Sequence, residues 1–211
     1  MNVNKRLLVR LQDRKQQMNQ QVTLVDIRAR FPALAIDLKY ASADNITGQP
    51  IYAEARCLLH PDAAAALERS LRIAQLAGLN LQVLDAYRPQ QAQQLLWNAC
   101  PNQDYVVPIA LGSNHSRGTA IDVTLIDENG HPLDMGTAFD EMDDLSHPYH
   151  PAVPQAAQRN RLLLNAIMFG GGFKGISTEW WHFELPDAAG YPLLDDVFAC
   201  LSPAHTDGVI P

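Results

Sequence analysis

The sequence is short of long apolar runs and of basic charge. No stretch of its 211 residues approaches the roughly 18 consecutive apolar residues that a membrane-spanning helix needs. Lys and Arg number 16 against 23 Asp and Glu, a net charge of −7, so the chain lacks the basic face of a general nucleic-acid binder. Apolar residues make up 47% and charged residues 18%, a composition that disfavours a disordered chain and permits a sizeable core.

Cysteines are few, and the beginning of the chain lacks the pattern of an export signal. Cys57, Cys100 and Cys200 are widely spaced and form neither a CxxC pair nor a disulfide framework. Positive charges continue as far as Lys15 and glutamines follow, with no apolar stretch after the first charges. We therefore expect reduced thiols and a cytoplasmic location, or a periplasmic one if a signal has been removed.

Residues 1–21 differ in charge from the rest of the chain. They hold five basic side chains and one acidic, Asp13, and Leu7, Leu8 and Leu11 recur at helical spacing. The pattern predicts an N-terminal helical extension over 1–21, followed by a single domain over 22–211. A basic helix can contact an anionic partner, but a solvated helix face is the more common role of such a charge run.

The rest of the pattern predicts helices and strands that do not alternate regularly. Helices are expected over 61–77, where Pro61 stands in the first turn and Gly78 ends the pattern, over 89–97 and over 161–169. Strands are expected over 81–85, 119–126 and 180–184. Because this order is not a βαβ series, we expect an α+β fold with a central, mainly antiparallel sheet flanked by helices.

A histidine and an aspartate stand on either side of a turn between residues 113 and 122. His115 lies in a turn-rich loop, and Asp122 lies on the following strand, among apolar and β-branched residues where a carboxylate needs a partner. Gly118 lets the chain bend, so the two side chains can converge although a straight strand would place them on opposite faces. A metal site is one interpretation; a turn-capping aspartate and a surface histidine are the alternative.

The segment from Glu179 to Glu184 is a second unusual cluster. On a strand, His182 and Glu184 share one face while Trp181 and Phe183 face the core, and a turn can bring Glu179 beside the imidazole. A catalytic zinc typically takes three protein ligands and often has a glutamate nearby as base. The two clusters together contain such a set: His115, Asp122 and His182 as ligands, with Glu179 as the base. A core histidine beneath a tryptophan is the alternative for this second cluster.

Arg88 is a third candidate, at the point where a predicted strand ends and a helix begins. Its guanidinium is permanently charged and can stabilise an oxyanion. A structural salt bridge with Asp85 or another acid is the commoner role of an arginine, and the sequence leaves both roles open.

These three clusters together resemble a known enzyme family. The patterns SxHxxGxAxD from residue 113, ExxH from residue 179 and YRP from residue 87 are similar to those of the zinc D,D-peptidases. Within that group the sequence most resembles the D-alanyl-D-alanine dipeptidases, the type associated with vancomycin resistance. Residues 40–48 and 135–140 also match blocks of these dipeptidases, except that Ile46 stands where the family has Phe. The resemblance covers roughly residues 36–186.

The resemblance implies one zinc ion per chain, in a cleft at one edge of the sheet, and a role for each candidate. His115, Asp122 and His182 would hold the zinc, Glu179 would act as general base, and Arg88 would stabilise the tetrahedral intermediate. Residues of a second group would bind the free ammonium end of the substrate: Asp140, Tyr40 and Ser113. Asp140 is implied by the resemblance alone, since it lies in an acidic loop where solvation is the default.

Three functions remain to be compared. The first is hydrolysis of D-Ala-D-Ala to two D-alanines, the second a D,D-carboxypeptidase or L,D-endopeptidase acting on peptidoglycan stem peptides. The third is a zinc-stabilised peptide-binding protein without catalysis; the presence of both Glu179 and Arg88 disfavours it. The sequence leaves open whether the task is antibiotic resistance or D-alanine recycling, and whether the chain forms a homodimer.

Overall fold

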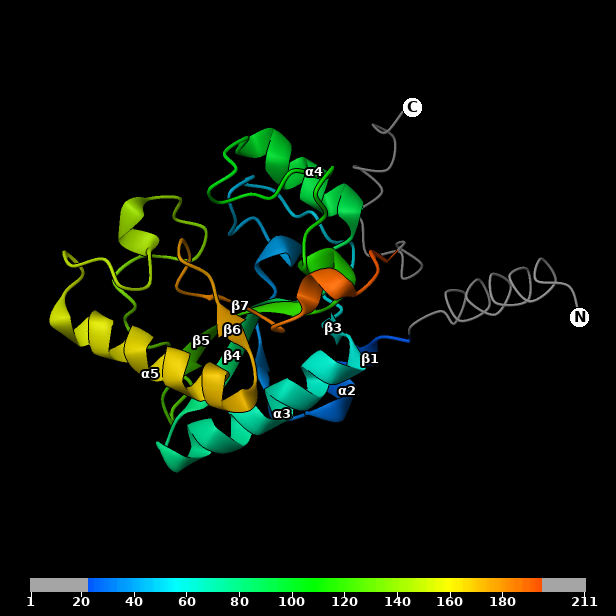
Figure 1. Ribbon diagram of the computed structural model, residues 1–211. Coiled ribbons are helices and arrows are strands. Elements are labelled where there is room, and N and C mark those ends of the chain that lie inside the picture. The colour runs from blue at the N-terminus through cyan, green and yellow to red at the C-terminus, as the bar shows by residue number, and fades with distance from the viewer. Residues whose placement is uncertain (1–22, 195–211) are drawn as a thin grey trace, which may run out of the picture.

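The computed structural model describes residues 23–194, so the helix predicted over residues 1–21 lies outside the described residues. A five-stranded sheet with the order β2-β4-β5-β7-β6 forms the centre (Figure 1). Its strands are β2 (Ala35–Ile36), β4 (Asn80–Asp85), β5 (Ala120–Ile126), β7 (His182–Glu184) and β6 (Lys174–Gly175). Only the β2–β4 pair is parallel, which confirms the predicted mainly antiparallel sheet. A small separate sheet pairs β1 (Val25–Asp26) with β3 (Leu58–Leu59).

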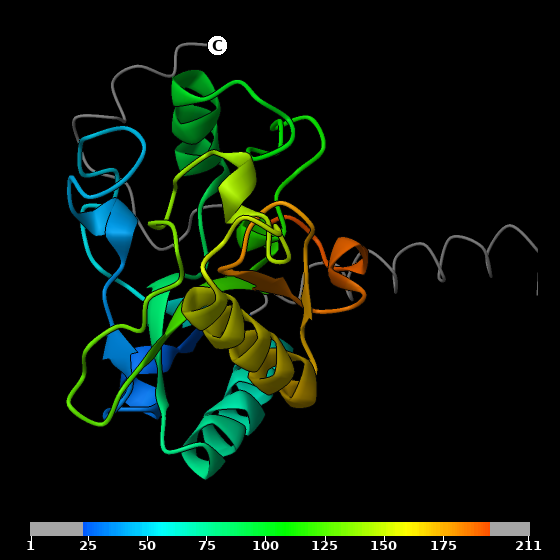
Figure 2. The same ribbon diagram turned by 90° about the vertical axis from the view of Figure 1, so that its left-hand side faces the viewer.

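Two long helices cover one face of this sheet. They are α3 (Pro61–Leu76) and α5 (Gln155–Gly171), which pack against each other in both views (Figures 1 and 2). The shorter α4 (Gln90–Ala99) lies apart from this pair, on the far side of the sheet in Figure 1, and α2 (Ile27–Arg30) is a single turn. The fold is therefore α+β, as predicted, with its long helices in one layer.

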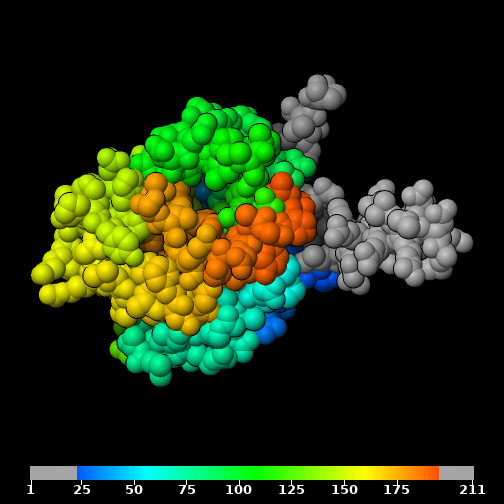
Figure 3. Space-filling view, viewed as in Figure 1, coloured from blue at the N-terminus to red at the C-terminus, as the bar shows by residue number. Residues whose placement is uncertain are grey.

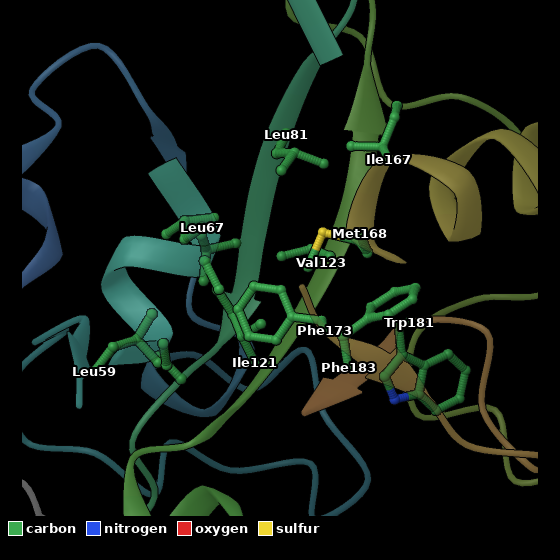
Figure 4. Close-up of a cluster of buried hydrophobic side chains, with 14 of the residues drawn as sticks. Leu59, Leu67, Leu81, Ile121, Val123, Ile167, Met168, Phe173, Trp181 and Phe183 are labelled. Carbon is green, nitrogen blue, oxygen red and sulfur yellow. The ribbon is translucent and has the colours of Figure 1, made fainter. Parts of the chain in front are cut away.

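The apolar core lies between the sheet and the pair of long helices. Alternate residues of the central strands, such as Ile121, Val123 and Phe183, are buried in this layer (Figure 4), and Val83 belongs to the same cluster. Met168 of α5 reaches the same cluster. Burying a side chain of this size contributes about 1.5–3 kcal/mol relative to leaving it exposed, so this layer supplies most of the hydrophobic stabilisation.

Predicted and observed boundaries differ most where apolar periodicity is weak. The helix predicted over 161–169 begins earlier, at Gln155, because its first turns are polar and follow Pro154. The strand predicted over 180–184 pairs only from His182 onward. The strand predicted over 119–126 is β5 almost to the residue. Within residues 23–194, no helix is both long and apolar enough to cross a membrane.

Candidate metal centre and active site

A row of polar side chains crosses three strands on the face of the sheet away from the two long helices. Asp122 of β5 pairs directly with Asp85 at the end of β4 on one side and with His182 at the start of β7 on the other. Directly opposed residues place their side chains on the same face. The sheet thus gathers residues from three distant parts of the sequence.

A bulge in β4 is what brings Asp85 into this row. The register shifts between Val83, which pairs with Val123, and Asp85, so Leu84 is the extra residue. Without that shift, Leu84 would stand opposite Asp122. Bulges are common beside functional sites because they re-aim a side chain in this way.

His115 reaches the row from a short turn. Residues His115–Arg117 form a 3₁₀ turn that ends at Gly118, whose φ of 69° lies in the left-handed region. A Cβ on Gly118 would stand 2.8 Å from the side chain of Leu24, so both the backbone conformation and the space favour glycine. The predicted bend at Gly118 is confirmed, and it turns His115 back toward Asp122.

Three potential ligand atoms converge at this point. His115 Nε2 lies 3.0 Å from His182 Nδ1 and 3.3 Å from Asp122 Oδ1, and His182 Nδ1 lies 3.1 Å from the same Asp122 oxygen. A tetrahedral site with bonds of about 2.0–2.1 Å separates its ligand atoms by about 3.3 Å. The triangle therefore fits one metal ion of this kind, and these three residues form a group able to hold one.

Hydrogen bonds at the outer sides of the imidazoles fix their orientation. His115 Nδ1 lies 2.8 Å from the carbonyl oxygen of Ala86, and His182 Nε2 lies 3.2 Å from Glu184 Oε2. Both acceptors require the facing nitrogen to carry the proton, which leaves His115 Nε2 and His182 Nδ1 free to bind a metal. Such outer partners commonly support histidine ligands.

Glu184 is itself held by two further residues. Asn114 Nδ2 donates to its Oε2 at 2.7 Å, and the Lys174 ammonium lies 3.0 Å from its Oε1. Burial opposes ionisation, but these contacts and His182 outweigh it and lower the pKa of Glu184 to about 2. In the same way, although burial opposes it, contact with His115 and His182 holds the pKa of Asp122 well below its usual range. Both carboxylates are therefore ionised.

Glu179 differs from the other carboxylates of the site. Its side chain is buried, yet no described residue donates a hydrogen bond to it. Burial, reinforced by the negative charges of Asp122 and Asp140, raises its pKa to about 8 against the opposing effect of His182 and Arg88. A buried carboxylate with free lone pairs and a raised pKa has the character of a proton acceptor.

Arg88 forms the structural salt bridge that the sequence allowed, and it also lines the cavity. Its Nε donates to Asp85 Oδ2 at 2.9 Å and its Nη1 donates to Gln93 Oε1 at 2.8 Å. Its Nη2 lies 3.5 Å from Asp122 Oδ2, and the guanidinium stacks 4.8 Å from the centre of the Tyr40 ring. The salt bridge with Asp85 is present, and it holds the cation beside the metal-binding group.

Asp140 also lines the site, and it has an unusual backbone conformation. Among residues 23–194 it is the only non-glycine residue with a positive φ, 61°. One carboxylate oxygen accepts a hydrogen bond from Tyr40 Oη at 2.9 Å, and the other accepts one from the backbone nitrogen of Ile46 at 3.2 Å. Burial raises its pKa to about 7, although these hydrogen bonds and Arg88 oppose the shift.

All eight predicted site residues line one cavity of about 130 Å³. They are His115, Asp122, His182, Glu179, Arg88, Asp140, Tyr40 and Ser113. Ser113 also accepts a hydrogen bond from the backbone of His115 through its Oγ, at 3.2 Å. Apolar side chains such as Ile46, Met142 and Trp181 complete the walls. Figure 3 shows the surface hollowed between the region of α4 and the segment that leads into β7.

Two buried polar residues beside the cavity were not assigned a role from the sequence. Glu184 was placed on the face of His182 without a function, and it is the partner that orients that imidazole. Gln93 lies in a glutamine-rich helix where nothing distinguishes it from its neighbours. Its burial on the Arg88 side, with its Nε2 donating to the Val107 carbonyl at 2.7 Å, is visible only in the fold.

The chain is similar to known peptidases. A family profile described as D-ala-D-ala dipeptidase, of peptidase family M15, matches residues 20–203. The D-alanyl-D-alanine dipeptidase of Escherichia coli K12 is 67% identical over 192 residues, which cover 91% of this chain and 100% of the relative. That of Enterococcus faecium is 36% identical over 172 residues, 72% of this chain and 85% of the relative.

Several solved structures also share similarity in fold. One of them is a mutant of the vancomycin-resistance D,D-pentapeptidase VanY in complex with Zn(II). It is 14% identical, has a TM-score of 0.41, and the match covers 62% of this chain and 74% of that one. The assignment depends instead on the family profile and on the relatives at 67% and 36% identity. On those two findings, the chain belongs to the D-Ala-D-Ala dipeptidase family of peptidases.

Proposed function

We propose that this protein is a zinc metallodipeptidase that hydrolyses D-alanyl-D-alanine to two D-alanines. The observation that carries the proposal is the content of one small cavity. A three-residue metal-binding group, an unpaired buried glutamate, an arginine and an acid suited to an ammonium group all line it. Membership of the dipeptidase family supports the same substrate.

His115, Asp122 and His182 would hold one zinc ion per chain. Two neutral imidazoles and one carboxylate suit zinc, and three protein ligands leave a coordination position open for chemistry. When bound at such a site, zinc acts as a Lewis acid that lowers the pKa of water and polarises a carbonyl. Asp122 contributes a full negative charge, and the outer partners of the two histidines keep their lone pairs directed inward.

Glu179 would move the protons. As a base it takes a proton from the attacking water, and as an acid it gives a proton to the departing amine of the second D-alanine. Its lack of a hydrogen-bond partner among the described residues leaves both oxygens free for these transfers. Its buried position strengthens the electrostatic interactions that the transfers depend on.

Arg88 would stabilise the negative charge that develops on the carbonyl oxygen. Asp85 and Gln93 anchor the guanidinium, so it is already oriented before substrate arrives. A donor that needs no reorganisation during the reaction contributes more than a mobile one.

Asp140 would bind the ammonium group of the substrate, with Tyr40 and Ser113 nearby. Tyr40 fixes one oxygen of Asp140, and Ser113 lies next to the metal-binding loop. A cavity of about 130 Å³ lined by Asp140 suits a free dipeptide better than a stem peptide, whose chain would continue past the ammonium position.

Location and domain limits complete the proposal. A free dipeptide substrate suits the predicted cytoplasmic location. The family match over residues 20–203 covers most of the proposed catalytic domain, 22–211, which would follow the extension at 1–21. No nucleic-acid partner is expected from the net charge of −7, and the oligomeric state, a homodimer included, remains to be measured.

The test compares three substrates with wild type and Asp140→Asn. Wild type should cleave D-Ala-D-Ala and should cleave N-acetyl-D-Ala-D-Ala and a stem pentapeptide poorly. Asp140→Asn keeps the shape and removes the charge, so kcat/KM for the free dipeptide should fall by about 10–100-fold. Zinc content should stay the same, because Asp140 is not a ligand.

The other two functions give different results. Faster cleavage of the pentapeptide than of the dipeptide, with no effect of Asp140→Asn, would return the protein to the carboxypeptidase or endopeptidase class. Bound zinc without turnover of any of the three peptides would indicate a binding protein.

A further inference from the structure

Arg161 is a buried cation outside the cavity that the proposed mechanism does not use. It projects from α5, its side chain is fully buried, and no carboxylate lies within ion-pair distance of it among residues 23–194. A buried charge without an ionic partner is costly unless dipoles replace the water it has lost. The groups that accept hydrogen bonds from the guanidinium in place of water therefore indicate the role of Arg161.

The guanidinium is surrounded by acceptors from a single loop. Nε donates to the Met135 carbonyl at 2.6 Å, and Nη1 donates to the carbonyls of Leu145 and His147, both at 2.8 Å. Nη2 donates to Thr137 Oγ1 at 3.2 Å. Arg161 therefore ties together the two ends of the segment from 135 to 147. Asp140 stands between those ends.

Hydroxyl groups extend this connection into the loop. Thr137 Oγ1 and Ser146 Oγ lie 3.0 Å apart, and Ser146 Oγ also donates to the Glu141 carbonyl at 2.6 Å. Since Thr137 Oγ1 already accepts a hydrogen bond from Arg161, it can donate one to Ser146 Oγ, which in turn donates to the Glu141 carbonyl. The residue after Asp140 is thus anchored, and this helps to maintain the left-handed conformation of Asp140.

Thr137 and Arg161 also contact the segment that carries Glu179, the proposed base. Trp180 Nε1 donates to Thr137 Oγ1 at 2.9 Å, and the Arg161 guanidinium lies 6.0 Å from the centre of the Trp180 ring. Trp180 follows Glu179 directly in the chain. Arg161 and Thr137 therefore connect the loop of Asp140 to the segment of Glu179, which leads into β7.

We infer that Arg161 is a positioning residue for substrate selection: it fixes the distance between the acid that binds the ammonium group and the reacting centre. The inference rests on the proposed function of Asp140. Arg161 neither lines the cavity nor belongs to the metal-binding group, so its effect on catalysis passes through the loop and through Trp180. A planar guanidinium can serve three carbonyls and a hydroxyl at once, which the point charge of a lysine cannot do.

The test uses Arg161→Lys in the full-length zinc-loaded protein, with Arg159→Lys as matched control. Arg159 lies on the same helix but is exposed. Arg161→Lys should raise KM for D-Ala-D-Ala by about tenfold, with kcat changed less than about threefold and zinc content unchanged. The preference for the free dipeptide over N-acetyl-D-Ala-D-Ala should fall by a similar factor. Arg159→Lys should behave as wild type.

Two further measurements separate positioning from a general loss of stability. Amide hydrogen exchange should become faster in residues 138–147 of Arg161→Lys and stay unchanged in β5. Adding Arg161→Lys to Asp140→Asn should change KM little further, because both variants remove the same interaction. If Arg161→Lys fails to fold, Thr137→Val removes the shared hydroxyl at similar volume and should give the same pattern.

Several results would overturn the inference. Equal loss of kcat/KM on free and acetylated dipeptides, or additive effects in the double variant, would show that Arg161 acts through stability alone. Unchanged KM in both Arg161→Lys and Thr137→Val would show that the loop needs no such anchor. A wild type without preference for the free dipeptide would remove the proposed role of Asp140, and this inference with it.

Discussion

The two faces of the central sheet carry different side chains on the same strands. On β5 and β7, Ile121 and Phe183 pack into the core against the long helices (Figure 4), while Asp122 and His182 line the cavity. Because side chains alternate along a strand, a step of one residue separates a position that serves stability from one that serves chemistry. Neighbouring substitutions should therefore have effects of different kinds.

The largest effect is expected from the polar face, with His182→Ala. Removing one of three ligands should release the zinc and reduce turnover of D-Ala-D-Ala by at least about a thousand-fold. Metal analysis after dialysis and single-substrate kinetics measure both losses. Phe183→Leu, one residue further and on the other face, is the control: it should keep the zinc. A zinc-loaded and active His182→Ala would remove His182 from the ligand set.

Glu179→Gln should have the next largest effect, and it should separate loss of catalysis from loss of metal binding. The amide cannot accept the proton of water, so kcat should fall by about 10²–10⁴-fold. The zinc content should equal that of wild type, since the three ligands are intact. Loss of zinc would make Glu179 a ligand, and near-normal kcat would exclude it as the base.

Glu184, on the polar face, should make the stability of the fold depend on pH in the acid range. Its folded-state pKa of about 2 lies below its ordinary value of 4.5, so the ionised carboxylate stabilises the fold fully above pH 4.5. That contribution, on the order of 2–3 kcal/mol, should be lost as the pH falls from 4.5 through 2. Urea unfolding of the metal-free protein at pH 6, 4 and 3 should show a shallower decline for Glu184→Gln than for wild type. Parallel curves would contradict the assignment.

The smallest effect is expected from the apolar face, with Ile121→Val. Removing one methylene from this fully buried residue should lower the free energy of unfolding by about 0.5–1.5 kcal/mol. Because Ile121 points away from the cavity, kcat/KM and zinc content should match wild type, although Asp122 is its immediate neighbour. A change in kcat/KM larger than about threefold would show that the two faces are coupled.

Residues close in sequence were the ones that could be assigned from the sequence. His115 and Asp122 are joined by one turn at Gly118, and Glu179 and His182 are only three positions apart in the sequence. Asp140 could not be assigned in this way. As one acid among several in a polar loop it looks solvated, and only its resemblance to a family block marked it before the contacts with Tyr40 and Ile46 were seen.

The sequence by itself determined the two chemical clusters, the α+β class and the alternation that divides each strand between core and cavity. These depend on local chemistry and on the two-residue period of a strand, both of which are written in short stretches of residues. Only the tertiary structure decided the bulge at Leu84 that aims Asp85, the partnership of His182 with Glu184, and the anchoring of the Asp140 loop by Arg161. Each of these depends on strand register or on hydrogen bonds between packed elements, which form only when the whole domain has closed.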